Sequence, residues 1–139
     1  MKKTDDLRQE LMASEDLDRF LADNTETFET DDCGELLQSL YEKIDVSKAE
    51  LARRSGMSTV YLYQVFSGRR RPSRDRLICL CFGLCCPVDI AQKLLKKCGH
   101  SPLYPKVRRD AIIIFSLDKG LSLQQVNDRL FAENEETLC

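Results

Sequence analysis

The chain has 139 residues, of which 42% are hydrophobic and 32% are charged, as in ordinary soluble globular proteins. No apolar run approaches the roughly 20 residues that a membrane span requires, and no apolar segment of the kind found in secretory signals follows the basic N-terminus. We therefore expect a cytoplasmic protein of one domain, with or without an appendage, that does not contact a membrane.

The net charge of −2 conceals a strong segregation of charge along the chain. Residues 1–46 carry 14 acidic and 5 basic side chains, whereas residues 47–76 carry 8 basic and 2 acidic ones. A charge run alone is usually a solvated surface, but neutralisation of phosphate groups also requires positive charge concentrated in one segment. Residues 47–76 are therefore the candidate segment for contact with nucleic acid.

The N-terminal third is predicted to be helical. Residues 5–23 place leucines and a phenylalanine among many acidic residues, which indicates an amphipathic helix in one or two parts. A polar linker, residues 24–30, follows. Asp32 and Glu35 have the spacing of a capping box, which predicts the start of the first core helix. Its apolar stripe is Leu36, Leu37, Leu40, Tyr41 and Ile44.

Two short helices joined by a tight turn are predicted next. Ser47 and Glu50 form a second capping-box pattern, and Gly56 can end the first helix because glycine tolerates a positive φ. Ser58 can then cap the second helix. Its apolar positions recur at helical spacing: Val60 or Tyr61, Leu62, Val65 and Phe66.

The second helix is predicted to stop at Gly68, and a basic loop, residues 69–72, follows it. Two short helices with a glycine-containing turn, the second of them flanked by positive charge, are typical of a helix-turn-helix. In such a unit the second helix enters the major groove of DNA.

The residues that carry a family pattern are Leu51-Ala52, Gly56, Ser58, Tyr61-Leu62, Val65, Gly68 and Pro72-Ser73. With them, residues 34–86 resemble the Cro/lambda-repressor-like helix-turn-helix family, the XRE-type bacterial regulators. The resemblance implies an all-α fold and a sequence-specific DNA-binding transcriptional regulator. It also implies double-stranded DNA as the partner and a homodimer as the active form.

The resemblance further implies which residues would contact DNA. Base contacts would come from Thr59, Val60, Tyr63 and Gln64, and phosphate contacts from Lys48, Ser58, Arg69, Arg70 and Arg71. Gln64 is the best candidate for reading a base, because its amide can pair bidentately with adenine. Val60, Tyr63 and Phe66 depart from the polar or acidic residues common in the family, so the target sequence cannot be read from these positions.

The remaining chain is predicted to form two helical hairpins. Ser73 would cap a helix that runs to about Leu84, and Pro87 would open the next one. A shift of 35 residues aligns this hairpin, residues 73–98, with residues 106–133, although chance similarity of two amphipathic hairpins is the alternative. Ser122 and Gln125 form a capping box. Residues 111–115 are apolar nearly all round and should be buried on several sides.

The sequence thus predicts an all-α fold in three parts. Residues 1–31 form an acidic N-terminal helical extension, residues 32–98 a lambda-repressor-like helix-turn-helix domain, and residues 99–139 a C-terminal helical hairpin. The hairpin either packs on the domain as ordinary core or supplies a dimer face.

Neither the cysteines nor the single histidine suggest catalysis. The seven cysteines are interpreted as small buried apolar side chains in a reducing compartment. A metal or redox-sensing site is the weaker alternative, because their spacing matches no usual zinc pattern. His100 lies in a loop without a nucleophile pattern, and no glycine-rich phosphate loop follows a strand. We expect no enzyme activity, no metal and no cofactor.

A second function class stays open, namely a protein-interaction module built on the same scaffold. The acidic N-terminus or the C-terminal hairpin would then bind a partner protein, and the aromatic surface of the second helix suits such a use. In a combined hypothesis the acidic segment covers the basic surface, so that deletion of residues 1–30 would tighten DNA binding.

Overall fold

The computed structural model describes residues 4–13, 16–23 and 33–139, and every regular element in these ranges is an α-helix. Residue contacts divide the chain into two units, residues 1–30 and residues 31–139. The first unit contains α1 (Thr4–Ala13) and α2 (Leu17–Asp23). The acidic segment therefore forms the helix in two parts that its pattern allowed.

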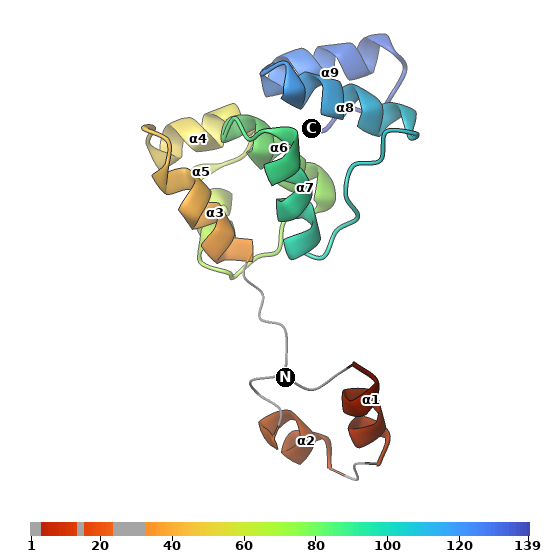
Figure 1. The fold of residues 1–139 in the computed structure, drawn as a ribbon. Helices are drawn as coiled ribbons and strands as arrows, with labels where there is room; N and C mark the ends of the chain where they lie inside the picture. Colours follow the sequence, from red (N-terminus) through yellow and green to blue (C-terminus); the bar gives the residue numbers. More distant parts are fainter. Residues whose placement is uncertain (1–3, 14–15, 24–32) are drawn as a thin grey trace. The chain divides into compact units, whose positions relative to one another are not determined.

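The second unit holds the remaining described helices (Figure 1). They are α3 (Cys33–Glu42), α4 (Lys48–Arg54), α5 (Thr59–Phe66), α6 (Arg74–Gly83), α7 (Val88–Lys97), α8 (Arg108–Asp118) and α9 (Leu123–Ala132). Helix α4 packs on α5 and α6, α3 packs on α5 and α7, and the α8–α9 hairpin contacts both α6 and α7. The all-α prediction is confirmed.

One apolar core runs through the second unit. Leu37, Leu51 and Leu62 bring α3, α4 and α5 into it, and each is fully buried. The side chains that α6 to α9 contribute and that are also fully buried include Leu77, Ile78, Leu80, Leu94, Leu95, Ile113, Val126 and Leu130. Because these residues come from both hairpins and from the helix-turn-helix, the C-terminal hairpin shares a core with the helices that it follows.

Serine caps set the start of four helices. The hydroxyl oxygens of Ser47, Ser58, Ser73 and Ser122 each accept a backbone N–H from the residue three positions later, over 3.1 to 3.3 Å. At Ser122 the capping box is complete, since its own N–H donates to Gln125 Oε1. At Ser47 the carboxylate of Glu50 instead accepts from arginines of its own helix. Asp32 lies outside the described residues.

The expectation that residues 111–115 are buried on several sides is wrong at one end. Ile113 is fully buried, but the Phe115 side chain is 58% exposed. The reason is that α8 faces the core along one side, while its other side borders a groove between α8 and α9.

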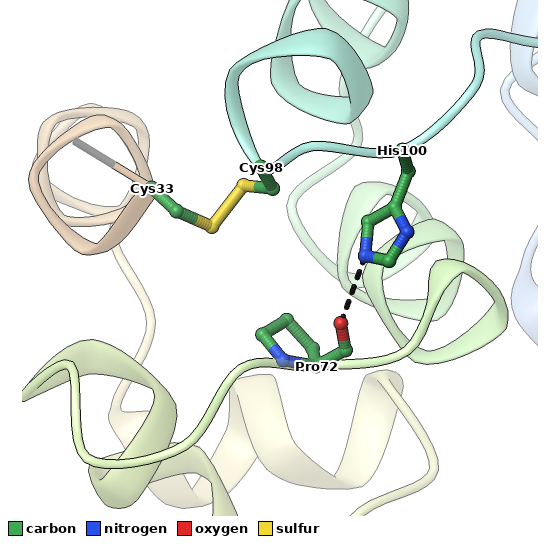
Figure 2. The surroundings of a disulfide bond; sticks show 4 residues. All are labelled: Cys33, Pro72, Cys98 and His100. Carbon is green, nitrogen blue, oxygen red and sulfur yellow. Dashed lines mark hydrogen bonds between the residues drawn. A yellow bond between two sulfur atoms is a disulfide. The ribbon is translucent and has the colours of Figure 1, made fainter. Parts of the chain in front are cut away.

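The uniform interpretation of the cysteines is also wrong. Cys33 and Cys98 form a disulfide that joins the start of α3 to the residue after α7 (Figure 2). Cys85 and Cys139 are exposed. Cys79, Cys81 and Cys86 are buried as expected, and burial raises the pKa of the Cys79 thiol to about 12.

Candidate nucleic-acid interface

The outer face of α5 is held away from the core by the burial of its opposite face. Leu62 and Val65 point into the core, whereas Val60 and Tyr63 are 68% and 53% exposed. This resolves the open alternative between Val60 and Tyr61 as the inward residue, since Tyr61 is the one that packs against the core. Thr59 is exposed at the start of the helix, and Gln64 is half-buried near its end. The four residues expected to face bases thus lie on α5, with Gln64 the least exposed of them.

Lys48, the first residue of α4, lies against a cluster of three aromatic rings. Its Nζ is 4.8 Å from the ring centroid of Tyr63, 5.1 Å from that of Phe66 and 5.7 Å from that of Tyr41. Tyr41 and Phe66 pack edge to face, with ring centroids 5.7 Å apart. Such cation–π contacts are attractive because the ring faces carry partial negative charge. Lys48 therefore connects α3, α4 and α5, a role that the sequence pattern did not indicate.

The basic loop folds back over the last turn of α5. The backbone N–H groups of Arg69 and Arg70 both donate to the carbonyl oxygen of Gln64, over 3.0 and 3.2 Å. Gly68 allows this reversal with a φ of +80°, a conformation that residues other than glycine rarely adopt. His100 Nε2 donates to the carbonyl oxygen of Pro72 over 3.0 Å, beside the disulfide (Figure 2). The loop is thus held at both of its ends.

Arg76 is a further basic residue next to α5, and the family pattern did not select it. Its guanidinium carbon lies 4.6 Å from the ring centroid of Tyr61, and that of Arg70 lies 5.5 Å from the same centroid. Tyr61 therefore brings a cation from α6 next to the loop that follows α5. The only signal in the sequence is the density of basic residues in 47–76, which assigns no role to any one of them.

Other basic residues of the segment are engaged in ion pairs. Glu50 accepts from Arg53 over 2.9 Å and from Arg54 over 3.3 Å, and the Arg53 guanidinium lowers the pKa of Glu50 to about 2. Arg74 donates to both carboxylate oxygens of Asp110, and Asp75 accepts from Arg109. These ion pairs hold Arg53, Arg54 and Arg74 within the fold but leave the net charge of residues 47–76 unchanged, because Asp110 and Arg109 add opposite charges.

The candidate residues lie along α5 and in the loop that follows it. Lys48 and Tyr63 are in contact, and Ser58 caps α5 through the backbone N–H of Tyr61. Arg69, Arg70 and Arg71 are exposed and follow the other end of the helix. An exposed helix face with cations beside it matches what a helix in a major groove requires, namely base contacts along its surface and phosphate contacts next to it.

Over the ranges that the structure describes, no group of three or more His, Cys, Asp or Glu side chains could hold a metal ion. Nor is any helix in those ranges long and apolar enough to cross a membrane.

Comparison with known proteins identifies the domain. Residues 32–92 match the family model described as a helix-turn-helix domain. No curated protein and no solved structure gives a significant match to the chain. The matched segment includes α4, the turn at Gly56 and the exposed helix α5. Residues 32–92 are thus a helix-turn-helix domain, which confirms the resemblance found in the sequence.

Proposed function

We propose that this protein is a sequence-specific transcriptional regulator that inserts α5 into the major groove of double-stranded DNA. The observation that carries the proposal is the exposed outer face of α5, with Val60 and Tyr63 turned outward in a helix-turn-helix domain. No enzymatic step is needed for this function, and it would be exercised in the cytoplasm, where bacterial DNA lies.

Each candidate residue has a chemical role in this proposal. Gln64 would pair with an adenine through its amide, while Thr59, Val60 and Tyr63 would contact neighbouring base edges and thymine methyl groups. The cations would neutralise phosphates next to the helix. They are Lys48, Arg69, Arg70 and Arg71, with Ser58 as a hydroxyl partner. Two copies of the chain would read two half-sites about one helical turn apart.

The proposal is tested by selection of bound sequences from a random DNA pool with the full chain. A regulator should enrich one motif, and a dimer should enrich an inverted repeat with half-sites about 10 base pairs apart. Gln64→Ala should change the preference at one base pair by ~1–3 kcal/mol. Ala substitution of Lys93, which is exposed on α7, serves as a control and should leave the motif unchanged.

A salt titration separates phosphate contacts from base contacts. Joint Ala substitution of Arg69, Arg70 and Arg71 should weaken binding to all sequences alike and flatten the salt dependence, by about 0.9 in slope for each phosphate that the variant no longer neutralises. A matched variant removes the same charge elsewhere, at Lys93, Lys96 and Lys106, which are exposed. Equal effects of the two triple variants would contradict the assignment.

The second candidate function is a protein-interaction module. The observation in its favour is that the most exposed residues of α5 include Val60 and Tyr63, which offer apolar and aromatic surface rather than several hydrogen-bonding groups. Salt-sensitive DNA binding without any enriched motif would favour this candidate over the regulator.

A further inference from the structure

The C-terminal hairpin repeats the geometry of the hairpin before it. Helix α7 spans Val88–Lys97 and α9 spans Leu123–Ala132, so both ends are displaced by the same 35 positions. The left-handed residues follow the same offset. Cys85 (φ 55°) corresponds to Gly120 (φ 69°), and Gly99 (φ 80°) corresponds to Asn134 (φ 58°). The backbone thus repeats through the second helix of each hairpin, the connection before it and the residue that follows its end.

The side-chain hydrogen bonds repeat with the same offset. Arg74 donates to the carbonyl oxygens of Ser101 and Pro102, and Arg109 donates to those of Glu136 and Thr137. Likewise, the N–H of Leu103 donates to Gln92 over 2.6 Å, and the N–H of Leu138 donates to Asn127 over 2.7 Å. Chance similarity between two amphipathic hairpins does not account for bonds that recur position by position.

The two hairpins also pair with each other reciprocally. Arg74 forms an ion pair of 3.0 Å with Asp110, and Arg109 forms one of 3.0 Å with Asp75. Arg74 corresponds to Arg109 and Asp75 to Asp110, so each hairpin gives the other the same two groups. Reciprocal contacts of this kind are the mark of an isologous, two-fold-related interface.

The equivalent outer faces of the two hairpins differ in what covers them. Leu77 and Leu80 of α6 are fully buried, and α6 packs against α4. Their equivalents on α8 are Ile112 and Phe115, and here Ile112 is half-buried and Phe115 is 58% exposed. The second hairpin therefore leaves partly exposed an apolar face whose equivalent residues in the first hairpin are buried.

This face forms a groove between α8 and α9 of about 630 Å³. Its apolar lining is Ala111, Ile112, Phe115, Leu121 and Ala132. Lys119 Nζ lies 5.6 Å from the ring centroid of Phe115, so a cation stands over this ring at one edge of the groove.

The charges around the groove are mixed and adjacent. Arg108, Asp128 and Arg129 belong to the lining, and Glu133 forms ion pairs with both arginines, at 2.6 and 3.4 Å. Neither a strongly acidic nor a strongly basic partner would be favoured by such a rim. A rim that carries both signs can be complementary to a second copy of itself, because two-fold symmetry brings different residues of the same patch together.

We propose that the groove between α8 and α9 is the docking site for a second copy of this chain. The two hairpins would meet face to face about a two-fold axis, each covering the Phe115 side chain of the other. Large aromatic side chains at the centre of a patch contribute most to such interfaces. The inference rests on the dimer of the proposed function and names its contact surface, but it uses none of the DNA contacts, so the two can be tested separately.

The test is sedimentation equilibrium of the full chain without DNA, from low micromolar to high micromolar concentration. We expect a monomer–dimer equilibrium whose Kd rises at least about 30-fold in Phe115→Glu, the change that corresponds to a central interface residue. Phe131→Glu is the matched control, because Phe131 is 77% exposed on α9 but does not line the groove. This variant should dimerise like the unsubstituted chain.

A charge exchange tests the two-fold arrangement itself. Arg129→Asp should weaken the dimer, and Asp128→Arg added to it should restore much of the affinity, because opposite charges again face each other. Circular dichroism and urea unfolding of each variant show that the monomer is folded. Since the exchanged residues are exposed, we expect no loss of fold.

Two other outcomes would overturn the inference, and a third would separate it from the proposed function. A monomer at every concentration would leave the groove to an amphipathic helix of another protein. A dimer that Phe115→Glu does not affect would place the contact between copies elsewhere. A dimer that depends on Phe115 but enriches no DNA motif would uphold this inference and contradict the proposed function instead.

Discussion

At the scale of the residue, the observed contacts of Lys48 and its proposed contact with DNA can be separated. Its ammonium group faces three aromatic rings, and the family resemblance places it at a DNA phosphate. Lys48→Met keeps most of the side-chain volume but removes the charge. We expect the free energy of unfolding to fall by about 0.5–1 kcal/mol, the usual contribution of a cation–π contact near the surface. The salt slope of DNA binding should also fall by about 0.9.

Urea unfolding measures the first effect and a salt titration of DNA binding the second. Lys93→Met is the control, because Lys93 is an exposed lysine of α7, and it should change neither quantity. If Lys48→Met lowers stability but leaves the salt slope intact, the lysine serves only to hold α3, α4 and α5 together, and its assignment as a phosphate ligand is wrong.

At the scale of the element, the contact between α4 and α6 sets the position of the helix-turn-helix on its support. A Cβ atom added at Gly83 would lie 2.0 Å from Ser55 Oγ and 3.1 Å from Leu51 Cδ1. Gly83→Ala should therefore separate the two helices and lower the free energy of unfolding by about 1–3 kcal/mol. The clash should outweigh the gain in helix propensity, which is about 1 kcal/mol.

Ser55 makes this prediction a double-mutant cycle. Its hydroxyl is buried and has no hydrogen-bond partner in the described structure, so Ser55→Ala alone should be neutral or slightly stabilising. Gly83→Ala should cost less in the Ser55→Ala background, because the closest atom is then gone. Equal effects in both backgrounds, measured by urea unfolding, would show that the close approach is not the cause.

Local signals predicted the elements well. Serine hydroxyls at Ser47, Ser58 and Ser73 fix the starts of helices through bonds to residues only three positions away, and such short-range chemistry is visible in a sequence. The exposure of Phe115 could not be predicted in this way. Its burial depends on which side of α8 meets the rest of the fold, and a segment that is apolar all round gives no preference.

At the scale of the whole molecule, ion pairs between distant residues could not be predicted from the sequence. Arg74 belongs to the basic segment expected to face DNA, but it joins the two hairpins by an ion pair with Asp110, 36 positions away. The 35-residue repeat was visible as apolar spacing, whereas the reciprocal ion pairs became evident only in the fold. The DNA contacts and the three-part division of the chain stay predictions.

The disulfide joins two cysteines that lie far apart in the described chain. Cys33 and Cys98 are 65 positions apart. Chain-entropy arguments give a loop of this length a stabilisation of about 4 kcal/mol, and removal of native disulfides typically costs about 2–5 kcal/mol. Reduction by a dithiol, or joint Ser substitution of both cysteines, should lower the free energy of unfolding by about 2–5 kcal/mol. Cys85→Ser, at an exposed free cysteine, should leave it unchanged.

The Cys33–Cys98 disulfide also makes the candidate nucleic-acid interface sensitive to the redox state of its compartment. An ideal Cβ at Gly34, next to Cys33, would lie 3.0 Å from the carbonyl oxygen of Phe66, so the start of α3 packs against the end of α5. In a reducing compartment the disulfide would be largely open, and the fold would depend there on its apolar core alone. Thiol counting in denaturant, with and without reductant, tests whether the disulfide is present. The oxidised chain should show five free thiols. Seven reactive thiols in a chain purified under oxidising conditions would contradict the pairing, and DNA binding should then be independent of dithiol.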